Sequence, residues 1–131
     1  MKEEDKELLL KDLCARLPYG VKCVFYSKDG YIPSTIIKID IDNELVSHKP
    51  DGQSLVYVYP VEEIISYLRP ISSMTEEELA EWQFELDMDI DGYCIPSYPA
   101  LDWLNAHHFD YRGLIKKGLA LEAPEDMYKT E

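Results

Sequence analysis

Apolar and polar residues follow two different periods in the first half of the chain. Residues 2–17 form the first stretch, with leucines at positions 9, 10, 13 and 17. These leucines lie on one face of a helix, because an α-helix turns once every 3.6 residues. Pro18 and Gly20 interrupt the pattern, and both residue types are typical of a helix end. We therefore expect an N-terminal helix over residues 2–17.

From Val21 onward the apolar residues recur at every second position, which is the period of a β-strand. Asp29-Gly30 predicts a hairpin turn and Asp42-Asn43 a second turn. Pro33 has no backbone N–H, so we expect it at the edge of a strand or at a bulge. Between the two turns, one strand face is expected to carry the side chains of Thr35, Ile37, Ile39 and Ile41. Further short strands predict a small bent antiparallel sheet or an SH3-like barrel over residues 21–71.

Helix signals mark the C-terminal part of the chain. Thr75 and Glu78 have the spacing of a capping box, in which each side chain accepts a hydrogen bond from the other residue's backbone N–H. Pro99 is suited to the first turn of a third helix that reaches about residue 108. The helix that starts at the capping box is expected to bury a stripe formed by Leu79, Trp82 and Leu86.

The end of the chain predicts one more short turn. Asp110 is expected to cap this turn, and Gly118 to end it in the left-handed conformation. An extended, buried piece is expected at residues 119–121, and the tail from Pro124 onward is expected to fray. The whole pattern predicts a single α+β domain over residues 1–131, with a helix at 2–17, a sheet or barrel at 21–71 and C-terminal helices at 75–123 packed on it.

The net charge of −13 changes the range of expected partners. Nucleic-acid binding depends on clustered Lys and Arg that release counterions from phosphates. Lys116-Lys117 is the only adjacent basic pair in the sequence, so we expect no direct nucleic-acid binding. Basic or neutral proteins are the expected partners, and imitation of nucleic acid by the acidic surface is an open alternative.

Cysteine usage and the N-terminus indicate a cellular setting. The sequence has three cysteines, Cys14, Cys23 and Cys94, and no CxxC pair. An odd number without paired spacing favours free thiols in a reducing compartment. The acidic N-terminus does not resemble a signal peptide, and no apolar run has the length of a membrane span. We therefore expect a cytoplasmic protein without membrane attachment.

Three aspartates at alternating positions raise the possibility of a cation site. Asp87, Asp89 and Asp91 precede Gly92, which matches the first half of an EF-hand calcium loop. The twelfth position of such a loop requires a bidentate Glu, but the residue there is Tyr98. Two interpretations follow: a calcium site formed by the three aspartates, or a solvated acidic turn without a cofactor.

His107 and His108 form the second candidate site. Adjacent side chains on a helix point about 100° apart, which makes shared coordination of one metal unfavourable. The remaining histidine, His48, lies in the β-region. A structural pair, with one His packed under Trp103 and the other exposed, is one interpretation. A metal or acid–base site is the other.

No nucleotide-binding loop, nucleophile elbow or other established catalytic motif is present in the sequence. We interpret the chain as a non-catalytic protein-interaction or regulatory module. Since Trp, Tyr and Arg dominate interface energetics, the predicted binding residues are Trp103, His107, His108, Tyr111 and Arg112. A purely structural role for these five is an alternative, in which Arg112 packs its apolar stem on the surface with its charge in solvent, or pairs with the acidic second helix. The alternative function is a metal-dependent or small-ligand enzyme that uses the His107–His108 pair and the Asp87–Asp91 stretch.

Two segments carry a family resemblance. They are YLRPISSMTEEE at residues 67–78 and LDWLNAHHFDYRGLIKKGLALEAPEDMY at residues 101–128. Both are similar to a group of small proteins of gut anaerobic bacteria, their phages and other mobile elements. That group has no assigned activity, so the resemblance implies no catalytic residue. It implies a cytoplasmic accessory protein of phage-related origin that acts on a host or phage protein.

Overall fold

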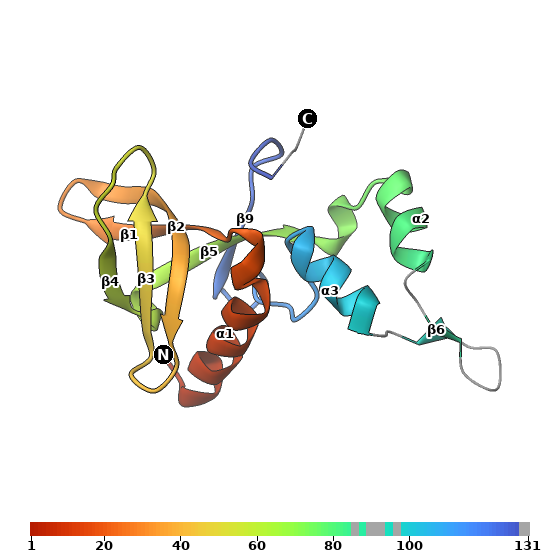
Figure 1. Ribbon diagram of the computed structural model, residues 1–131, viewed down its shortest axis with the longest axis horizontal. Coiled ribbons are helices and arrows are strands. Elements are labelled where there is room, and N and C mark those ends of the chain that lie inside the picture. The colour runs from red at the N-terminus through yellow and green to blue at the C-terminus, as the bar shows by residue number, and fades with distance from the viewer. Residues whose placement is uncertain (85–86, 89–93, 96–97, 129–131) are drawn as a thin grey trace.

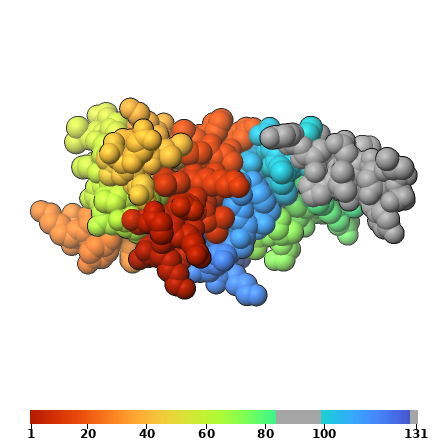
Figure 2. Space-filling view, turned by 90° about the horizontal axis from the view of Figure 1, so that it is seen from below, coloured from red at the N-terminus to blue at the C-terminus, as the bar shows by residue number. Residues whose placement is uncertain are grey.

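The computed structural model of the chain describes residues 1–84, 87–88, 94–95 and 98–128. The molecule is elongated, with a β-sheet at one end, helices α2 and α3 at the other, and α1 between them (Figure 1). Seen from below, α1 in red lies between sheet residues in yellow to green and C-terminal residues in blue (Figure 2). The helices span α1 Glu3–Arg16, α2 Glu76–Phe84 and α3 Tyr98–Ala106, and short 3₁₀ turns span η1 Leu17–Tyr19, η2 Val61–Glu63 and η3 Ile71–Ser73.

The N-terminal helix is confirmed. Leu9 and Leu13 are almost fully buried on the face that the leucine spacing predicts, whereas Leu17 lies in the following turn and is half-buried. Gly20 ends that turn with φ +75°, and its N–H donates to the Leu17 carbonyl at 3.4 Å. The buried leucines of α1 join a core that includes Val21, Phe25, Ile36, Val46, Ile64 and Leu68.

Within the described residues, seven strands form one sheet. They are β1 Lys22–Ser27, β2 Gly30–Asp40, β3 Leu45–Pro50, β4 Tyr57–Pro60, β5 Ile64–Pro70, β8 Phe109–Asp110 and β9 Ala120–Glu122. The order is β4-β3-β2-β1-β5-β8, with β9 also paired to β5. A second, two-stranded pairing joins β6 Asp87–Met88 to β7 Cys94–Ile95.

The α+β class is confirmed, but the sheet is open and mixed, so it is neither a closed barrel nor wholly antiparallel. The strands β1 to β5 pair antiparallel. The strands β8 and β9 come from the C-terminal part and pair with β5 in parallel. Such pairing requires a long connection, and here the connection contains α2 and α3. The C-terminal part is therefore joined to the sheet through its backbone as well as through helix packing.

A β-bulge corrects the predicted faces of β2. The register of β2 against β3 shifts between Ile36 and Lys38. A bulge places one extra residue in the strand, so the side chains beyond it change faces. Ile36 is consequently buried, while Ile37 is 46% exposed. The prediction that Thr35, Ile37, Ile39 and Ile41 share one face is wrong, because Ile39, beyond the bulge, packs against the core while Ile37 is exposed. Ile41 lies beyond the strand and is 61% exposed.

Pro33 lies at a position where the sheet needs no backbone N–H donor. The β2–β3 ladder ends at the pair Ser34–Pro50, and the Asp51 N–H donates to the Pro33 carbonyl at 3.1 Å. The amide nitrogen and the carbonyl of one strand residue point to the same side. The nitrogen of Pro33 therefore faces the point where β3 has ended, which agrees with the predicted edge position.

Helix α2 begins with the predicted capping box, but its apolar side chains are less buried than predicted. The Glu78 N–H donates to Thr75 Oγ1 at 3.1 Å, and the Thr75 N–H donates to Glu78 Oε1 at 3.1 Å, which forms the capping box. Leu79, however, is 42% exposed, and Trp82 is half-buried. The prediction of a buried stripe is wrong for Leu79, and Leu86 lies outside the described residues.

The last turns of the chain show the predicted caps. Both carboxylate oxygens of Asp110 accept backbone hydrogen bonds at 2.9 Å, from Leu114 and Ile115. Gly118 has φ +76°, its N–H donates to the Ile115 carbonyl, and the Leu119 N–H donates to the Leu114 carbonyl. These two bonds are those of a Schellman motif. The extended piece after them is β9, in which Ala120 is buried and Leu121 is exposed.

The expected fraying from Pro124 onward is wrong for Tyr128. Its hydroxyl donates to the Tyr67 carbonyl at 2.8 Å and accepts from the Lys22 N–H at 2.9 Å. Burial raises the pKa of Tyr128 above its ordinary value. The tail is therefore tied to β1 and β5 through Tyr128. None of the helices in the described ranges combines the length and the apolar character needed to cross a membrane.

Candidate functional site

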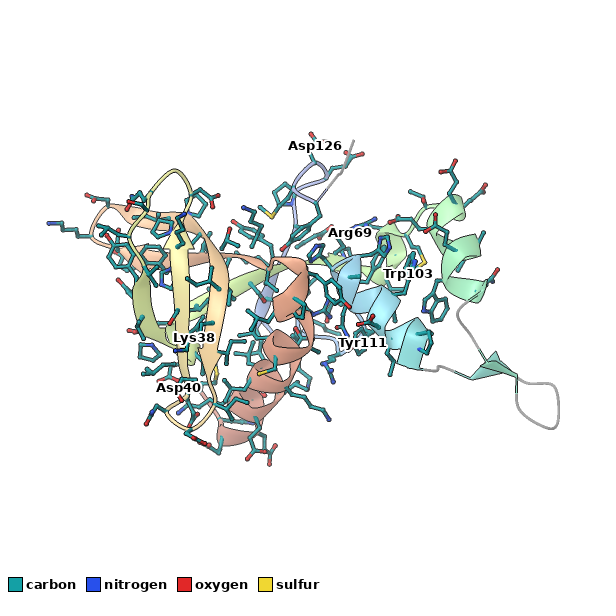
Figure 3. All side chains as sticks on the ribbon, in the orientation of Figure 1. Lys38, Asp40, Arg69, Trp103, Tyr111 and Asp126 are labelled. Carbon is teal, nitrogen blue, oxygen red and sulfur yellow. The ribbon has the colours of Figure 1, made fainter. Side chains whose placement is uncertain are left out.

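The predicted binding residues gather where α3 meets β5 and α1. Figure 3 shows Arg69, Trp103 and Tyr111 in this region. The Trp103 ring stacks on His107, with ring centroids 4.0 Å apart and planes 26° apart. The same indole lies parallel to Phe109 at 5.9 Å. Trp103 and His107 are each half-buried, so much of their surface is already covered by neighbours within the chain.

His108 lies deeper than its neighbour. It leaves α3 with φ +65°, is 8% exposed, and stacks on the Tyr128 ring with centroids 3.6 Å apart. Burial, reinforced by the positive charges of Arg16 and Arg69 and by the neighbouring His107, lowers the pKa of His108 to about 4. The structural interpretation of the pair is confirmed for the His under Trp103, but the second His is buried rather than exposed. His108 is neutral at pH 7.

A buried polar network lies beneath the histidines. Asp12 and Arg16, both fully buried in α1, form an ion pair with Arg16 Nε 2.9 Å from Asp12 Oδ2. Arg16 Nη2 also donates to the Phe109 carbonyl at 2.6 Å. Arg112 Nε donates to the other oxygen of Asp12 at 3.1 Å. One carboxylate therefore joins two guanidinium groups that lie far apart in the sequence.

Tyr111 completes this network. Its hydroxyl accepts from Arg112 Nη2 at 2.9 Å and donates to Asn105 Oδ1 at 3.0 Å. Both Arg16 and Arg112 lie over its ring, at 5.3 Å and 4.8 Å from the centroid. The expected pairing of Arg112 with the acidic second helix is wrong, because its carboxylate partner is Asp12 of α1.

Asp12 and Arg16 were absent from the residues predicted by sequence. The available signal was a pair of opposite charges at spacing i,i+4 on the face that carries Leu9 and Leu13. Charged residues at buried helix positions require partners, because an unpaired buried charge is costly. The network ties α1 to the segment after α3, and its contacts lie within the chain.

An acidic groove opens beside the network. It has a volume of about 860 Å³ and is lined by Arg69, Glu77, Glu81, His107, Glu122 and Tyr128, among others. Arg69 binds both carboxylate oxygens of Glu78 at 2.7 and 2.8 Å and lies over the Phe109 ring at 4.1 Å. The hydrogen bonds from Arg69 lower the pKa of Glu78 to about 2. Among the described residues, no three His, Cys, Asp or Glu side chains are placed to hold a metal ion.

The candidate calcium and metal ligands are only partly described by the structure. The side chain of Asp87 is not described, although its backbone lies in β6 opposite Ile95. Asp89 and Asp91 lie outside the described residues. His48 is buried in β3, where its Nδ1 lies 2.8 Å from Ser34 Oγ and its ring contacts Phe25. It does not join the His107–His108 pair.

The described cysteine thiols are poorly suited to nucleophilic catalysis. Cys14 is half-buried and Cys23 is buried, and both are free. Burial raises the pKa of Cys14, and burial together with the charge of Asp51 raises the pKa of Cys23 to about 12. Since the thiolate is the nucleophile, both shifts disfavour these cysteines as nucleophiles.

Exposed apolar residues concentrate at the sheet end of the molecule. Tyr26 and Tyr31 face each other across the β1–β2 hairpin, with ring centroids 5.5 Å apart and planes 72° apart. They are 66% and 65% exposed. We call this pair the tyrosine tip. In and just before the edge strand β4, Leu55, Val56 and Val58 are each more than half exposed.

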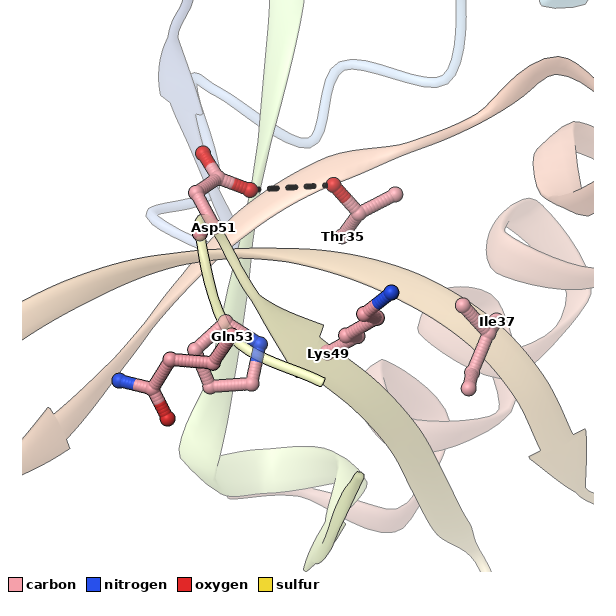
Figure 4. Close-up of a pocket in the computed structure, with 7 residues that line it drawn as sticks. Thr35, Ile37, Lys49, Asp51 and Gln53 are labelled. Atoms are coloured by element: carbon pink, nitrogen blue, oxygen red, sulfur yellow. Dashed lines mark hydrogen bonds between the residues drawn. The ribbon is translucent and has the colours of Figure 1, made fainter. Parts of the chain in front are cut away.

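A shallow hollow also lies on the sheet. It has a volume of about 460 Å³ and lies over β2, β3 and the turn that follows β3. Thr35 Oγ1 donates to Asp51 at its rim, 3.4 Å away, and Ile37 and Lys49 flank it (Figure 4). Lys22 Nζ donates to the same Thr35 oxygen at 2.9 Å. The polar groups at its rim therefore bond to one another.

The chain was compared with protein-family models, with curated proteins and with solved structures, and none of the three comparisons gives a match.

Proposed function

We propose that this protein is a non-catalytic protein-interaction module that contacts its partner through the tyrosine tip. The observation that carries the proposal is the exposure of Tyr26 and Tyr31 at the end of a hairpin. Tyrosine provides a large, stiff ring with a polar hydroxyl, which suits a surface that is wet when free and buried when bound. A strongly exposed aromatic pair adds nothing to the core, so a binding role accounts for it better than a folding role.

The charge supports a partner that is basic or neutral. The whole chain carries a net charge of −13, and long-range attraction steers oppositely charged partners toward it. A cytoplasmic location and a phage-related origin are part of the same proposal. The five residues predicted from sequence are engaged in internal stacking, ion pairing or hydrogen bonding, so the tip is favoured over them as the contact surface.

The enzyme alternative finds little support among the described residues. The two described cysteines have raised pKa values. His107 and His108 stack on different rings. No metal-binding group of three side chains is found in the described ranges. The one specific observation on its side is the acidic groove lined by His107.

The test compares three tagged forms in capture experiments from source-cell lysate, followed by binding measurements with the purified partner. They are the wild type, a Tyr26→Thr/Tyr31→Thr variant, and a Leu121→Thr control that removes an exposed apolar side chain from β9. Threonine keeps a residue that favours strands. We expect the wild type and the control to bind the same partner, and the tyrosine variant to bind it at least about tenfold more weakly.

A partner that binds the tyrosine variant as tightly as the wild type would refute the role of the tip. A Trp103→Ala/Arg112→Ala variant is a poor probe, because Arg112 holds the buried Asp12. Loss of binding in that variant would not separate a contact from a folding defect.

A further inference from the structure

We infer that residues 124–128 form a detachable strap, and that Tyr128 fills a slot which takes a tyrosine side chain of another protein once the strap has left. The slot consists of the Lys22 N–H, the Tyr67 carbonyl and the His108 ring, and we call it the phenol slot. The inference does not depend on the tyrosine tip.

The polar groups of the phenol slot match a hydroxyl group. The Tyr128 hydroxyl donates to the Tyr67 carbonyl at 2.8 Å and accepts from the Lys22 N–H at 2.9 Å. A hydroxyl can do both because it donates and accepts through a single oxygen. The two backbone groups belong to β1 and β5, which pair with each other in the sheet. Strand pairing therefore holds the donor and the acceptor in place whether or not Tyr128 lies between them.

The His108 ring is the wall of the slot on which an aromatic ring stacks. Its centroid lies 3.6 Å from that of Tyr128, and the two planes are 14° apart. His108 is 8% exposed with Tyr128 in place, and its Nδ1 has no hydrogen-bond partner among the described residues. Stacking selects an aromatic ring, and the two hydrogen bonds select a hydroxyl. Together they favour a phenol over an aliphatic alcohol or a phenyl ring.

The strap can leave without breaking a strand pair, because residues 124–128 belong to no strand. The chain leaves β5 at Ala123, and the turn that follows is closed by the Met127 N–H, which donates to the Pro124 carbonyl at 3.0 Å. Asp126 is exposed at the outer end of this turn (Figure 3). The Tyr128 side chain then brings the chain back to the sheet. The end of the strap is therefore held by the group that fills the slot.

Like charges oppose closure of the strap. Exposed carboxylates line both sides of the acidic groove, Glu77 and Glu81 on α2 and Glu122 and Glu125 next to and within the strap. The arginine that also lines the groove is already bound to both carboxylate oxygens of Glu78. Carboxylates on the two sides of one groove repel each other. This repulsion acts against the contacts of Tyr128 and leaves the strap poised to open.

Amide hydrogen exchange of the wild type tests whether the strap detaches. The Lys22 N–H donates to the Tyr128 hydroxyl, whereas the Ile36 N–H donates to the Val21 carbonyl at 3.0 Å. Opening of the strap frees the first N–H and leaves the second bonded. We expect the Lys22 amide to exchange at least about a hundredfold faster than the Ile36 amide. Equal rates would mean that only global unfolding releases Tyr128, and they would overturn the inference.

Charge variants separate opening of the strap from fraying of β1. Glu81→Gln/Glu125→Gln removes one carboxylate from each side of the groove, and the control Glu4→Gln/Glu7→Gln removes two exposed carboxylates from α1. At low ionic strength we expect the groove variant to slow exchange of the Lys22 amide at least about threefold. The control should exchange as the wild type does. Equal rates in the two variants would contradict a strap held against like charges.

Ligand binding to Tyr128→Ala tests what the slot takes. The probe is p-cresol, which is the tyrosine side chain as a free molecule, and toluene is the same molecule without the hydroxyl. We expect p-cresol to bind this variant at least about tenfold more tightly than toluene, and at least about tenfold more tightly than it binds the wild type, whose slot is filled. Titrations followed by NMR measure the affinities, and the Lys22 amide signal reports the site. Equal affinity for both compounds, or equal binding of p-cresol to both proteins, would overturn the inference. The exchange measurement on the wild type decides the inference where Tyr128→Ala fails to fold.

Discussion

At the residue scale, the burial of His108 and its stacking on Tyr128 could not be predicted from the sequence. The spacing of the pair predicts two side chains pointing apart, and the structure places one against Trp103 and the other against Tyr128. The second contact depends on a residue 20 positions later, so the sequence pattern carries no signal for it. Its φ of +65° is a conformation that His adopts more readily than most residues.

The low pKa of His108 predicts a loss of stability in mild acid. The unfolded chain protonates His108 near pH 6.5, but the folded chain only near pH 4. Between these values the unfolded state binds more protons, so stability falls as the pH falls. We expect wild type to lose about 2 kcal/mol more than His108→Asn between pH 7 and pH 5.

Urea denaturation of both proteins at the two pH values measures this difference. Asparagine removes the titrating imidazole and tolerates the left-handed conformation. The pH dependence of stability that comes from the carboxyl groups is the same in both proteins, so it cancels in the comparison. Equal losses in the two proteins would contradict a buried, neutral His108.

At the scale of elements, α2 shows how a helix can be specified locally and still pack weakly. Its capping box lies within four residues, so the pattern of Thr75 and Glu78 is sufficient to predict it. Glu78 also binds Arg69 of β5, and this ion pair fastens the first turn to the sheet. The exposure of Leu79 could not be predicted, because it depends on which surfaces reach α2 in the folded chain.

Removing the cap tests how far α2 depends on it. We expect Thr75→Ala to destabilise the helix by about 1 kcal/mol, since one N–H in the first turn loses its acceptor. The effect should appear as faster amide hydrogen exchange within α2. The exposed Ser72→Ala is the control, and it should leave the exchange rates unchanged. Equal rates in Thr75→Ala and wild type would show that the Arg69–Glu78 pair alone holds this turn.

At the scale of the whole molecule, buried charges join segments that are distant in the sequence. Asp12 of α1 and Arg112 are separated by 100 residues, and the Phe109 carbonyl accepts from Arg16 across 93 residues. The parallel pairing of β8 and β9 with β5 crosses the same boundary. The N-terminal helix, the sheet and the C-terminal part are therefore joined by direct contacts.

Deleting the shared carboxylate should weaken this whole structure. Asp12→Ala leaves Arg16 fully buried without its carboxylate partner, and removal of one partner from a buried ion pair costs about 3–5 kcal/mol. Glu7→Ala, an exposed acidic position of the same helix, should cost less than about 0.5 kcal/mol. Chemical denaturation measures both values. A loss below about 1 kcal/mol for Asp12→Ala would contradict a central role for the network.

Features that depend on near neighbours can be predicted from the amino-acid sequence alone. These are the N-terminal helix, the hairpins, the capping box, the Asp110 cap and the left-handed Gly118, all of which use contacts within about five residues. Tertiary contacts are needed to explain the bulge at Ile37, the burial of Asp12, the hydrogen-bonded Tyr128 and the open edge at β4. Each of these depends on strand register or on contacts between distant segments, because burial is a property of the folded chain.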